Sequence, residues 1–134
     1  MIKAVIFDYG AVINRRLRLQ KPILKLAAEL RANGVKTAVL SNMVVPLAWA
    51  VKHRRTLQDF EPNIFSCDIG VRKPNAKSYE AVIERLGLKP EECLFVDNRA
   101  DNIAGAQAVG MQTVQAKNTT QTIADIRSYL TRSR

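Results

Sequence analysis

The sequence predicts an α/β fold of three layers, in which a central parallel sheet of about five strands carries helices on both faces. Two observations support this fold class. Short apolar runs rich in β-branched residues alternate with longer amphipathic segments along nearly the whole chain. Three of the apolar runs end in a polar side chain, namely Asp8, Ser41 or Asp97, and the carboxyl ends of strands are where open α/β sheets bind ligands.

The first half of the chain supplies three of the expected strands and two of the helices. Its first helix has an apolar stripe, begins near Pro22 because proline suits a first turn, and ends at Asn33-Gly34. The expected elements are a strand at residues 3–7, a polar and basic connection at 13–20, a helix at 22–33, a strand at 35–40, a helix at 44–57 and a short strand at 63–66.

The second half continues the alternation, and glycines close two of its helices, at Gly87 and Gly110. This order is typical of a Rossmann-like fold with right-handed crossovers. Because the carboxyl ends of parallel strands share one edge of a sheet, Asp8, Ser41 and Asp97 should converge there. The expected elements are a loop at residues 70–74, a helix at 76–86, a strand at 93–96, a helix at 101–109, a strand at 111–114 and a last helix at 120–130.

Length and composition predict a single domain, residues 1–134, in the cytoplasm. A chain of 134 residues is long enough to bury a core, and it shows no internal repeat, low-complexity tract or linker. Its apolar runs are too short to span a membrane, and the N-terminal run lacks the small-residue cleavage site of a secretory signal.

Positive charge is concentrated in the first part of the chain. Residues 1–60 hold eleven Lys and Arg against three acids, a balance of +8, whereas residues 61–134 hold ten against nine, a balance of +1. Such a field favours anionic partners, whether phosphorylated metabolites, nucleic acid or acidic protein surfaces. Aromatic residues are sparse and not interleaved with the basic ones, which disfavours a platform for single-stranded nucleic acid.

The polar residues at the expected sheet edge share a chemistry. A carboxylate such as Asp8 can attack a phosphoryl group and hold it as an acyl phosphate, but the negative charge on both groups requires a cation between them. Mg²⁺, which prefers oxygen ligands, fits Asp8 together with Asp97. The hydroxyl group of Ser41 and the ammonium group of Lys73, in the loop before a helix, would stabilise the phosphoryl oxygens.

Each of these residues also has an ordinary structural role open to it. Taken singly, Asp8 suits a turn, Ser41 a helix cap, Lys73 a solvated surface, and Asp97 and Asp101 a helix N-terminus. All of these roles would have to hold together, in the order of the expected elements, for the site to be absent. Their joint coincidence is improbable, which favours a shared phosphate and magnesium site.

Four segments in order resemble the motifs of the haloacid dehalogenase superfamily of aspartyl-phosphate hydrolases, and the resemblance covers nearly the whole chain. The branch that the chain most resembles has a first motif of the form FDxGxV, and its members include sugar-phosphate phosphatases. The matching segments are Ile6-Phe7-Asp8-Tyr9-Gly10-Ala11-Val12, Val39-Leu40-Ser41-Asn42, Arg72-Lys73-Pro74, and Leu94-Phe95-Val96-Asp97-Asn98 with Asp101-Asn102-Ile103 and Gly110-Met111.

The resemblance implies a role for each site residue. Asp8 would be the nucleophile and a Mg²⁺ ligand, and Ser41 and Lys73 would bind phosphate. Asp97 would complete the metal site, with support from Asp101. The arginines after the first motif lie where the family has a flap over the site. The candidate substrate-binding residues are Tyr9, Asn42, Arg15 and Arg16.

Two positions depart from the commonest form of these motifs. Many of the family's phosphatases carry a second Asp, a general acid and base, where this chain has Gly10. The carbonyl group of Gly10 can still bind Mg²⁺, but the proton donor is gone, and general acid–base help is typically worth ~10²–10⁴-fold in rate. Asn98 stands where many relatives have another Asp, which removes one negative charge from the metal site.

The spacing of the motifs leaves no room for the helical cap domain that this branch usually inserts. Thirty-two residues separate Asp8 from Ser41, and the expected helix and strand use most of them; the interval from Ser41 to Lys73 is similarly short. The site should therefore be open to solvent. By resemblance to capless relatives, the substrate would be a macromolecular phosphate, or a second subunit of a homo-oligomer would cover the site.

Three functions remain open on these observations. The first is a Mg²⁺-dependent phosphomonoester hydrolase that forms an aspartyl-phosphate on Asp8 in an open, capless site. The second is a catalytically weak domain of the same fold that binds an anionic protein or, less favoured, a nucleic acid through its basic N-terminal half. The third is a haloacid dehalogenase, against which Asp97 and Asp101 argue because that reaction needs no metal.

Overall fold

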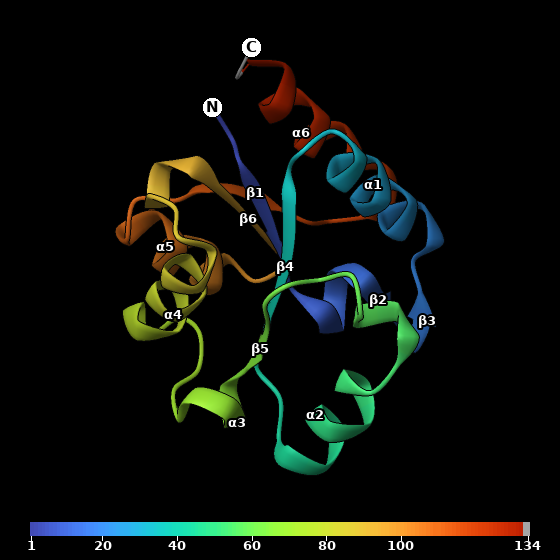
Figure 1. Cartoon of the computed structure of the whole chain (residues 1–134), viewed down its shortest axis with the longest axis vertical. Coiled ribbons are helices and arrows are strands. Elements are labelled where there is room, and N and C mark those ends of the chain that lie inside the picture. The colour runs from blue at the N-terminus through green and yellow to red at the C-terminus, as the bar shows by residue number, and fades with distance from the viewer. Residues whose placement is uncertain (133–134) are drawn as a thin grey trace.

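A five-stranded parallel sheet forms the centre of the computed structural model, which describes residues 1–132 (Figure 1). Residues 133 and 134, part of the expected domain, lie outside the described residues. The strands are β1 (Ala4–Phe7), β4 (Lys36–Ser41), β5 (Asn63–Phe65), β6 (Cys93–Asp97) and β7 (Gln112–Gln115). Their order is β5, β4, β1, β6, β7, so β1 lies in the middle of the sheet.

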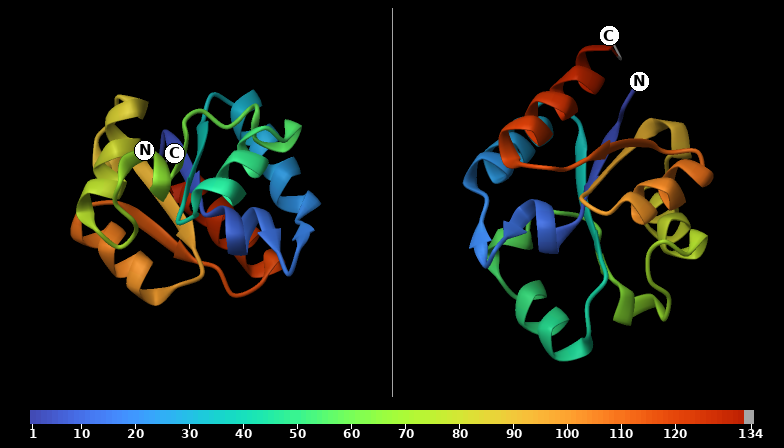
Figure 2. Two further views of the ribbon diagram at one scale, coloured as in Figure 1. Left: turned by 90° about the horizontal axis from the view of Figure 1, so that it is seen from below. Right: turned by 180° about the vertical axis from the view of Figure 1, so that it is seen from behind.

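Helices cover both faces of the sheet, which confirms the expected three-layer Rossmann-like fold (Figures 1 and 2). None of the helices within residues 1–132 is long and apolar enough to cross a membrane. One face carries α1 (Lys21–Ala32) and α6 (Thr119–Arg132), and the other carries α4 (Ala76–Leu86) and α5 (Ala100–Ala108).

Successive residues of the central strand are buried on opposite faces. Val5 and Phe7 pack in the core under α1 and α6, whereas Ala4 and Ile6 pack in the core under α4 and α5. A parallel strand buried on both faces needs apolar side chains at every position. This requirement explains why the sequence marks its strands by continuous apolar runs instead of by alternation.

The basic connection after β1 forms a hairpin, which the sequence pattern did not predict. A π-helical turn at Tyr9–Ile13 leads into β2 (Asn14–Arg15) and β3 (Arg18–Leu19), which pair antiparallel. Arg16 and Leu17 at the tip have φ angles of 52° and 63°. Two-residue hairpin loops with positive φ at both positions usually carry Asn or Gly, so neither residue signals the turn.

The segment expected as one helix at residues 44–57 is divided in two. Helix α2 (Val45–Lys52) is followed by a 3₁₀ turn at Arg55–Leu57. The buried side chains of α2 are Ala48 and Val51, and Leu57 is also fully buried. On a continued helix Leu57 would lie far around from those two residues, so the break is what lets it reach the core.

Short elements fill the two intervals in which a cap domain could be inserted. Between Asp8 and Ser41 lie the hairpin, α1 and β4. Between Ser41 and Lys73 lie α2, the 3₁₀ turn, β5 and the short helix α3 (Ser66–Ile69). Neither interval therefore contains a further folded unit above the carboxyl edge of the sheet.

Candidate active site

Three side chains meet at the carboxyl edge of the sheet, where β4, β1 and β6 end side by side. Asp8 follows β1 directly, Ser41 is the last residue of β4, and Asp97 is the last residue of β6. The hydroxyl group of Ser41 donates a hydrogen bond to Oδ1 of Asp8 at 3.4 Å, and the N–H of Ala11 donates to Oδ2 at 3.2 Å. The parallel order of the strands brings these groups together.

Lys73 joins the two carboxylates. Its ammonium group donates hydrogen bonds to Oδ1 of Asp8 at 2.9 Å, to Oδ2 of Asp97 at 2.7 Å and to the carbonyl group of Leu40 at 2.9 Å. These bonds use all three N–H donors of the ammonium group. Because the side chain is only 1% exposed, Lys73 is a buried cation instead of the solvated surface residue that its type suggests.

Asn42 holds the backbone of Lys73 in place. Its side-chain nitrogen donates to the carbonyl group of Lys73 at 3.1 Å, and its side-chain oxygen accepts from the N–H of Lys73 at 2.8 Å. Both ends of this amide are therefore engaged by protein, although Asn42 also lines the cavity of the site. Asn42 is therefore a positioning residue for Lys73, and its contact with substrate stays a prediction.

Asn102 is a site residue to which the motif pattern assigned no role. Its side-chain nitrogen donates to Oδ2 of Asp97 at 3.1 Å, and its carbonyl group accepts from the hydroxyl group of Tyr79 at 2.7 Å. Burial raises the pKa of Tyr79, and the charges of Asp97 and Asp101 raise it further, so the phenol remains a donor. The signal in the sequence is weak, an Asn in the first turn of the helix after β6.

The charges of the site are not balanced. Burial raises the pKa of Asp8, the ammonium group of Lys73 opposes that rise, and the carboxylate of Asp97 adds to it. Two buried carboxylates thus face one ammonium group, which leaves one negative charge where water solvates it poorly. Such a cluster attracts a further cation.

The ligands that this site offers to a metal are oxygens. Asp8 and Asp97 would provide carboxylates, and Gly10, which lines the same cavity, has a backbone carbonyl group that would be the further ligand. Within residues 1–132 no group of three or more His, Cys, Asp and Glu side chains is suited to a metal. Mg²⁺ in proteins usually has one or two carboxylates and several waters as ligands. The oxygen atoms and the residual negative charge of the cluster fit this ion.

Asp101 lies at the rim of the site. Its carboxylate accepts two hydrogen bonds from the guanidinium group of Arg99, each at 3.1 Å, and its side chain is 51% exposed. These hydrogen bonds lower the pKa of Asp101. In the structure Asp101 therefore forms an ion pair with Arg99, and its Oδ1 also accepts a hydrogen bond from the N–H of Asn102, the residue that binds Asp97, at 2.9 Å.

The cluster lines a cavity of about 750 Å³. Asn98, Arg72 and Arg99 contribute to the same lining, as do apolar residues just before α2 and in its first turn. Several of these residues are exposed to solvent, Asn98 and Arg99 among them. The cavity is therefore open to solvent at its rim, while the side chain of Asp8 within it is 11% exposed.

The structure does not bring Tyr9, Arg15 and Arg16 into this cavity. Tyr9 is 4% exposed and belongs to the core under α1. Arg15 and Arg16 lie on the hairpin and line, with Arg18, a separate hollow of about 590 Å³. The guanidinium group of Arg15 donates to the carbonyl group of Lys117 at 2.7 Å. The hairpin thus turns Arg15 toward the segment after β7 instead of toward the nucleophile.

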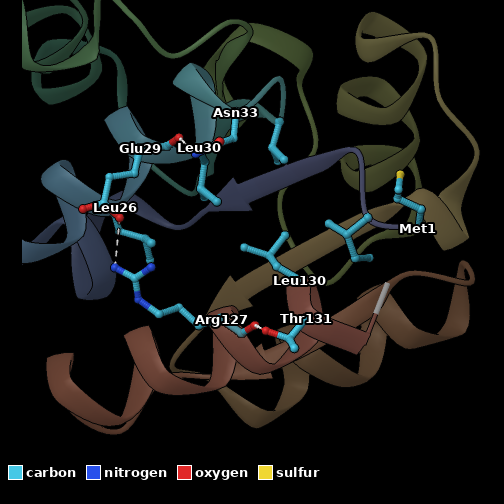
Figure 3. Close-up of a pocket in the computed structure, with 10 residues that line it drawn as sticks. Met1, Leu26, Glu29, Leu30, Asn33, Arg127, Leu130 and Thr131 are labelled. Carbon is cyan, nitrogen blue, oxygen red and sulfur yellow. Dashed lines mark hydrogen bonds and ion pairs between the residues drawn. The ribbon is translucent and has the colours of Figure 1, made fainter. Parts of the chain in front are cut away.

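An apolar pocket of about 320 Å³ lies between α1 and α6 (Figure 3). Leu30 and Leu130 line it from the two helices, and Arg127 pairs with Glu29 at 2.9 Å. Met1, which precedes β1, also lines this pocket. It therefore belongs to the amino edge of the sheet, remote from the cluster around Lys73.

The fold and the cluster place this chain among α/β proteins with an acidic, lysine-bridged site at the carboxyl edge of a parallel sheet. The family model of the haloacid dehalogenase-like hydrolases matches residues 2–110, which is most of the chain. The chain belongs to this family, as the resemblance of its motifs predicted.

Several relatives of this chain are phosphatases by name. A sesquiterpene phosphatase from Aspergillus oryzae is 29% identical over 115 residues, which are 85% of this chain and 59% of the relative. A glyceraldehyde 3-phosphate phosphatase from Methanopyrus kandleri is 29% identical over 119 residues, which are 87% of this chain and 51% of the relative. The chain thus spans little more than half of the length of these two relatives.

Solved structures share the fold. An uncharacterized protein from Corynebacterium glutamicum matches with a TM-score of 0.87 at 25% identity, over 96% of this chain and 94% of the other. A HAD family enzyme from Bacteroides thetaiotaomicron, in complex with magnesium and inorganic phosphate, matches with a TM-score of 0.73 at 19% identity, over 87% of this chain and 95% of the other. At this identity the second match shows a common fold.

Proposed function

We propose that this chain is a Mg²⁺-dependent phosphomonoester hydrolase that works through an aspartyl-phosphate on Asp8. The observation that carries this proposal is the ammonium group of Lys73, which is buried between the carboxylates of Asp8 and Asp97 and lines a cavity open to water. The phosphatase names of two relatives support the same class of reaction.

The nucleophile in this reaction is the carboxylate of Asp8. One of its oxygens attacks phosphorus, the bond from phosphorus to the ester oxygen breaks, and the leaving oxygen takes a proton from water in the cavity. The hydroxyl group of Ser41 and the ammonium group of Lys73 lie beside Oδ1 of Asp8, where they can bind the phosphoryl oxygens. Water then attacks phosphorus, which releases phosphate and restores the carboxylate.

Asp8, Asp97 and the carbonyl group of Gly10 would hold Mg²⁺, which supplies positive charge between the nucleophile and the phosphoryl group. The ammonium group of Lys73 shifts its hydrogen bond from Asp8 to a phosphoryl oxygen when substrate binds. Asn42 holds the backbone of Lys73 through both ends of its amide, so only the ammonium end of the side chain has to reorient.

Hydrolysis of an aryl phosphate by the purified chain, with and without Mg²⁺, tests this function. We expect turnover to require Mg²⁺ and to vanish in Asp8→Asn, which keeps the shape of the side chain. Asp59→Asn is the matched control, because Asp59 is an exposed acid outside the cavity and its loss should leave the rate unchanged. Turnover that survives in Asp8→Asn would exclude the aspartyl-phosphate mechanism.

The hollow lined by Arg15, Arg16 and Arg18 favours a second candidate function, the binding of an anionic partner. Three arginines on one short hairpin create a concentrated positive field. Retention on heparin that falls with salt, and that Arg16→Glu with Arg18→Glu abolishes, would support this candidate. If such binding occurs while no phosphate ester is turned over, the second function replaces the first.

A phosphorylated substrate is the partner that the proposed reaction requires. A homo-oligomer in which a second copy covers the site stays a prediction from the open cavity. Size-exclusion chromatography of the chain, with and without Mg²⁺ and inorganic phosphate, measures whether such an assembly forms.

A further inference from the structure

Helix α2 and the residue before it expose an apolar surface beside the active-site cavity. Residues 43–51 carry nine apolar side chains in succession. A helix that is apolar on all sides is normally buried on all sides, but α2 is buried only at Ala48 and Val51. A contiguous exposed apolar patch commonly marks a binding site for a ligand, a protein or a membrane. The large side chains that are more than half exposed are Val44, Val45, Leu47 and Trp49.

The exposed surface has two flanks, and one of them faces the site. Leu47 and Trp49 are two residues apart, which places them about 160° apart around the helix axis. Leu47 lines the active-site cavity together with Met43 and Val44. Trp49 instead packs against the ring of His53, with the ring centroids 4.7 Å apart. We call Met43, Val44 and Leu47 the apolar lip.

The apolar lip is fixed to the rest of the site. The N–H of Met43 donates to Oγ of Ser66 at 2.8 Å, and the hydroxyl group of Ser66 donates to the carbonyl group of Met43 at 3.2 Å. Asn42, the preceding residue, binds the backbone of Lys73. Because the lip is already ordered, little conformational freedom is lost when a ligand packs on it.

The chemistry of the lip selects among leaving groups. A phosphoryl group held by Asp8 and Lys73 shares its cavity with the lip, so the remainder of the ester can pack on these apolar side chains, although Arg72, Asn98 and Arg99 also line the cavity. The hydroxyl groups of a polyol would lose water there without gaining a hydrogen-bonding side chain from the lip. A hydrocarbon chain would gain free energy, because both surfaces leave water.

We propose that the substrate is the phosphate monoester of an apolar alcohol, whose hydrocarbon part packs on Met43, Val44 and Leu47. This inference rests on the proposed phosphatase function and adds the substrate class to it. The bond from phosphorus to the ester oxygen breaks, and Asp8 holds the phosphoryl group until water releases it. One water is consumed in total, its proton going to the alcohol and its hydroxyl group to phosphate.

Binding of alkylphosphonates, which cannot be hydrolysed at an ester bond, tests the lip independently of turnover. We would titrate the full chain with ethyl-, butyl-, hexyl- and octylphosphonate in the presence of Mg²⁺ and follow the ³¹P resonance. Full burial of a methylene is worth about fourfold in affinity, so about twofold per methylene is expected on a half-exposed lip. Leu47→Ser and Val44→Ser should each reduce the gain in affinity per methylene.

Trp49→Ser is the matched control, since it removes an exposed apolar side chain from the opposite flank of the same helix. It should keep the dependence of affinity on chain length. An affinity that does not change with chain length in the wild type would overturn the inference. The inference would also be overturned if the dependence of affinity on chain length were lost in Trp49→Ser and kept in Leu47→Ser.

Turnover separates this inference from the function on which it rests. We expect kcat/KM for octyl phosphate to exceed that for glycerol phosphate by about tenfold or more, and Leu47→Ser to reduce the difference. Equal rates for the two esters would overturn the inference and leave the phosphatase function intact. If neither ester is hydrolysed but phosphonate binding still depends on chain length and on Leu47, the proposed reaction would be excluded. The apolar subsite would then be supported without the phosphatase function.

Discussion

The ammonium group of Lys73 lies 2.7 Å from Oδ2 of Asp97, and each of these two side chains is only 1% exposed. The same ammonium group binds Asp8 at 2.9 Å. A buried ion pair of this kind adds little net stability, but removal of one partner leaves an uncompensated buried charge. Lys73 therefore links the ends of β1 and β6 by ion pairs, in addition to being a candidate phosphate ligand.

Replacement of Lys73 by Met should strongly destabilise the protein. Two buried carboxylates would lose their counter-charge, and the cost of leaving a buried charge unpaired is about 3–5 kcal/mol. Urea unfolding measures this loss. Lys77→Met, at an exposed lysine in the first turn of α4, should change stability by no more than about 0.5 kcal/mol. Equal stabilities of the two variants would contradict the assigned role of Lys73.

Replacement of Asp8 by Asn should have the opposite effect on stability while it abolishes turnover. Burial is the largest cause of the raised pKa of Asp8, so its charged form is disfavoured in the folded chain. Asn removes that charge and leaves Lys73 paired with Asp97 alone. Without Mg²⁺ we expect a gain of roughly 0.5–2 kcal/mol at pH 7, the size that single stabilising substitutions commonly give.

The gain from Asp8→Asn should depend on pH in a defined direction. Below the ordinary pKa of 3.8 the carboxyl group is protonated in both the folded and the unfolded chain, so the variant has no advantage. As the pH rises from 3.8 through the raised pKa of the folded state, the wild type loses stability and the advantage grows. Asp101→Asn is the control, because the Arg99 hydrogen bonds lower that pKa and its loss should not stabilise the protein.

The sequence suffices to predict the parts of the site that depend on strand ends. Asp8, Ser41 and Asp97 each stand at the end of a buried apolar run, and a parallel sheet brings all such ends to one edge. The same reasoning predicts the five strands and the helices on both faces, because burial on two faces leaves continuous apolar runs.

The remaining features depend on contacts between distant segments, which the local pattern does not record. Asn42 and Asn102 act through the backbone of Lys73 and the carboxylate of Asp97, respectively, and nothing near either asparagine signals this. The positions of Arg15 and Arg16 depend on a hairpin tip with positive φ at Arg16, a conformation that an arginine rarely adopts.

Helix α5 packs so closely on the loop after Lys73 that Gly105 should not tolerate a side chain. A Cβ atom there would lie 2.8 Å from Cβ and from the carbonyl oxygen of Pro74 and 2.9 Å from the hydroxyl group of Tyr79. Gly105→Ala should cost about 1–3 kcal/mol in urea unfolding and lower kcat, because the loop that carries Lys73 must shift. Ala104→Ser, at an exposed position of the same helix, should cost about 0.5 kcal/mol and leave kcat unchanged.

Gly10 is the position at which a single substitution should accelerate the proposed reaction. A Cβ atom there meets nothing within 4 Å, and the residue lines the cavity beside Asp8, so Gly10→Asp fits without strain. The new carboxyl group would give the leaving oxygen the proton that water now supplies. General acid help is worth ~10²–10⁴-fold, and we expect kcat for alkyl phosphates to rise toward the lower end of that range.

The leaving group provides the decisive comparison for Gly10→Asp. An alkoxide needs a proton to depart, whereas a nitrophenolate departs readily without one, so the gain should be large for an alkyl phosphate and small for a nitrophenyl phosphate. Gly10→Asn has nearly the same shape but no acidic proton, and it should give no gain on either ester. Equal gains in kcat for Gly10→Asp and Gly10→Asn would show that the added side chain acts by filling the cavity. Proton donation by water would then not limit the wild-type reaction.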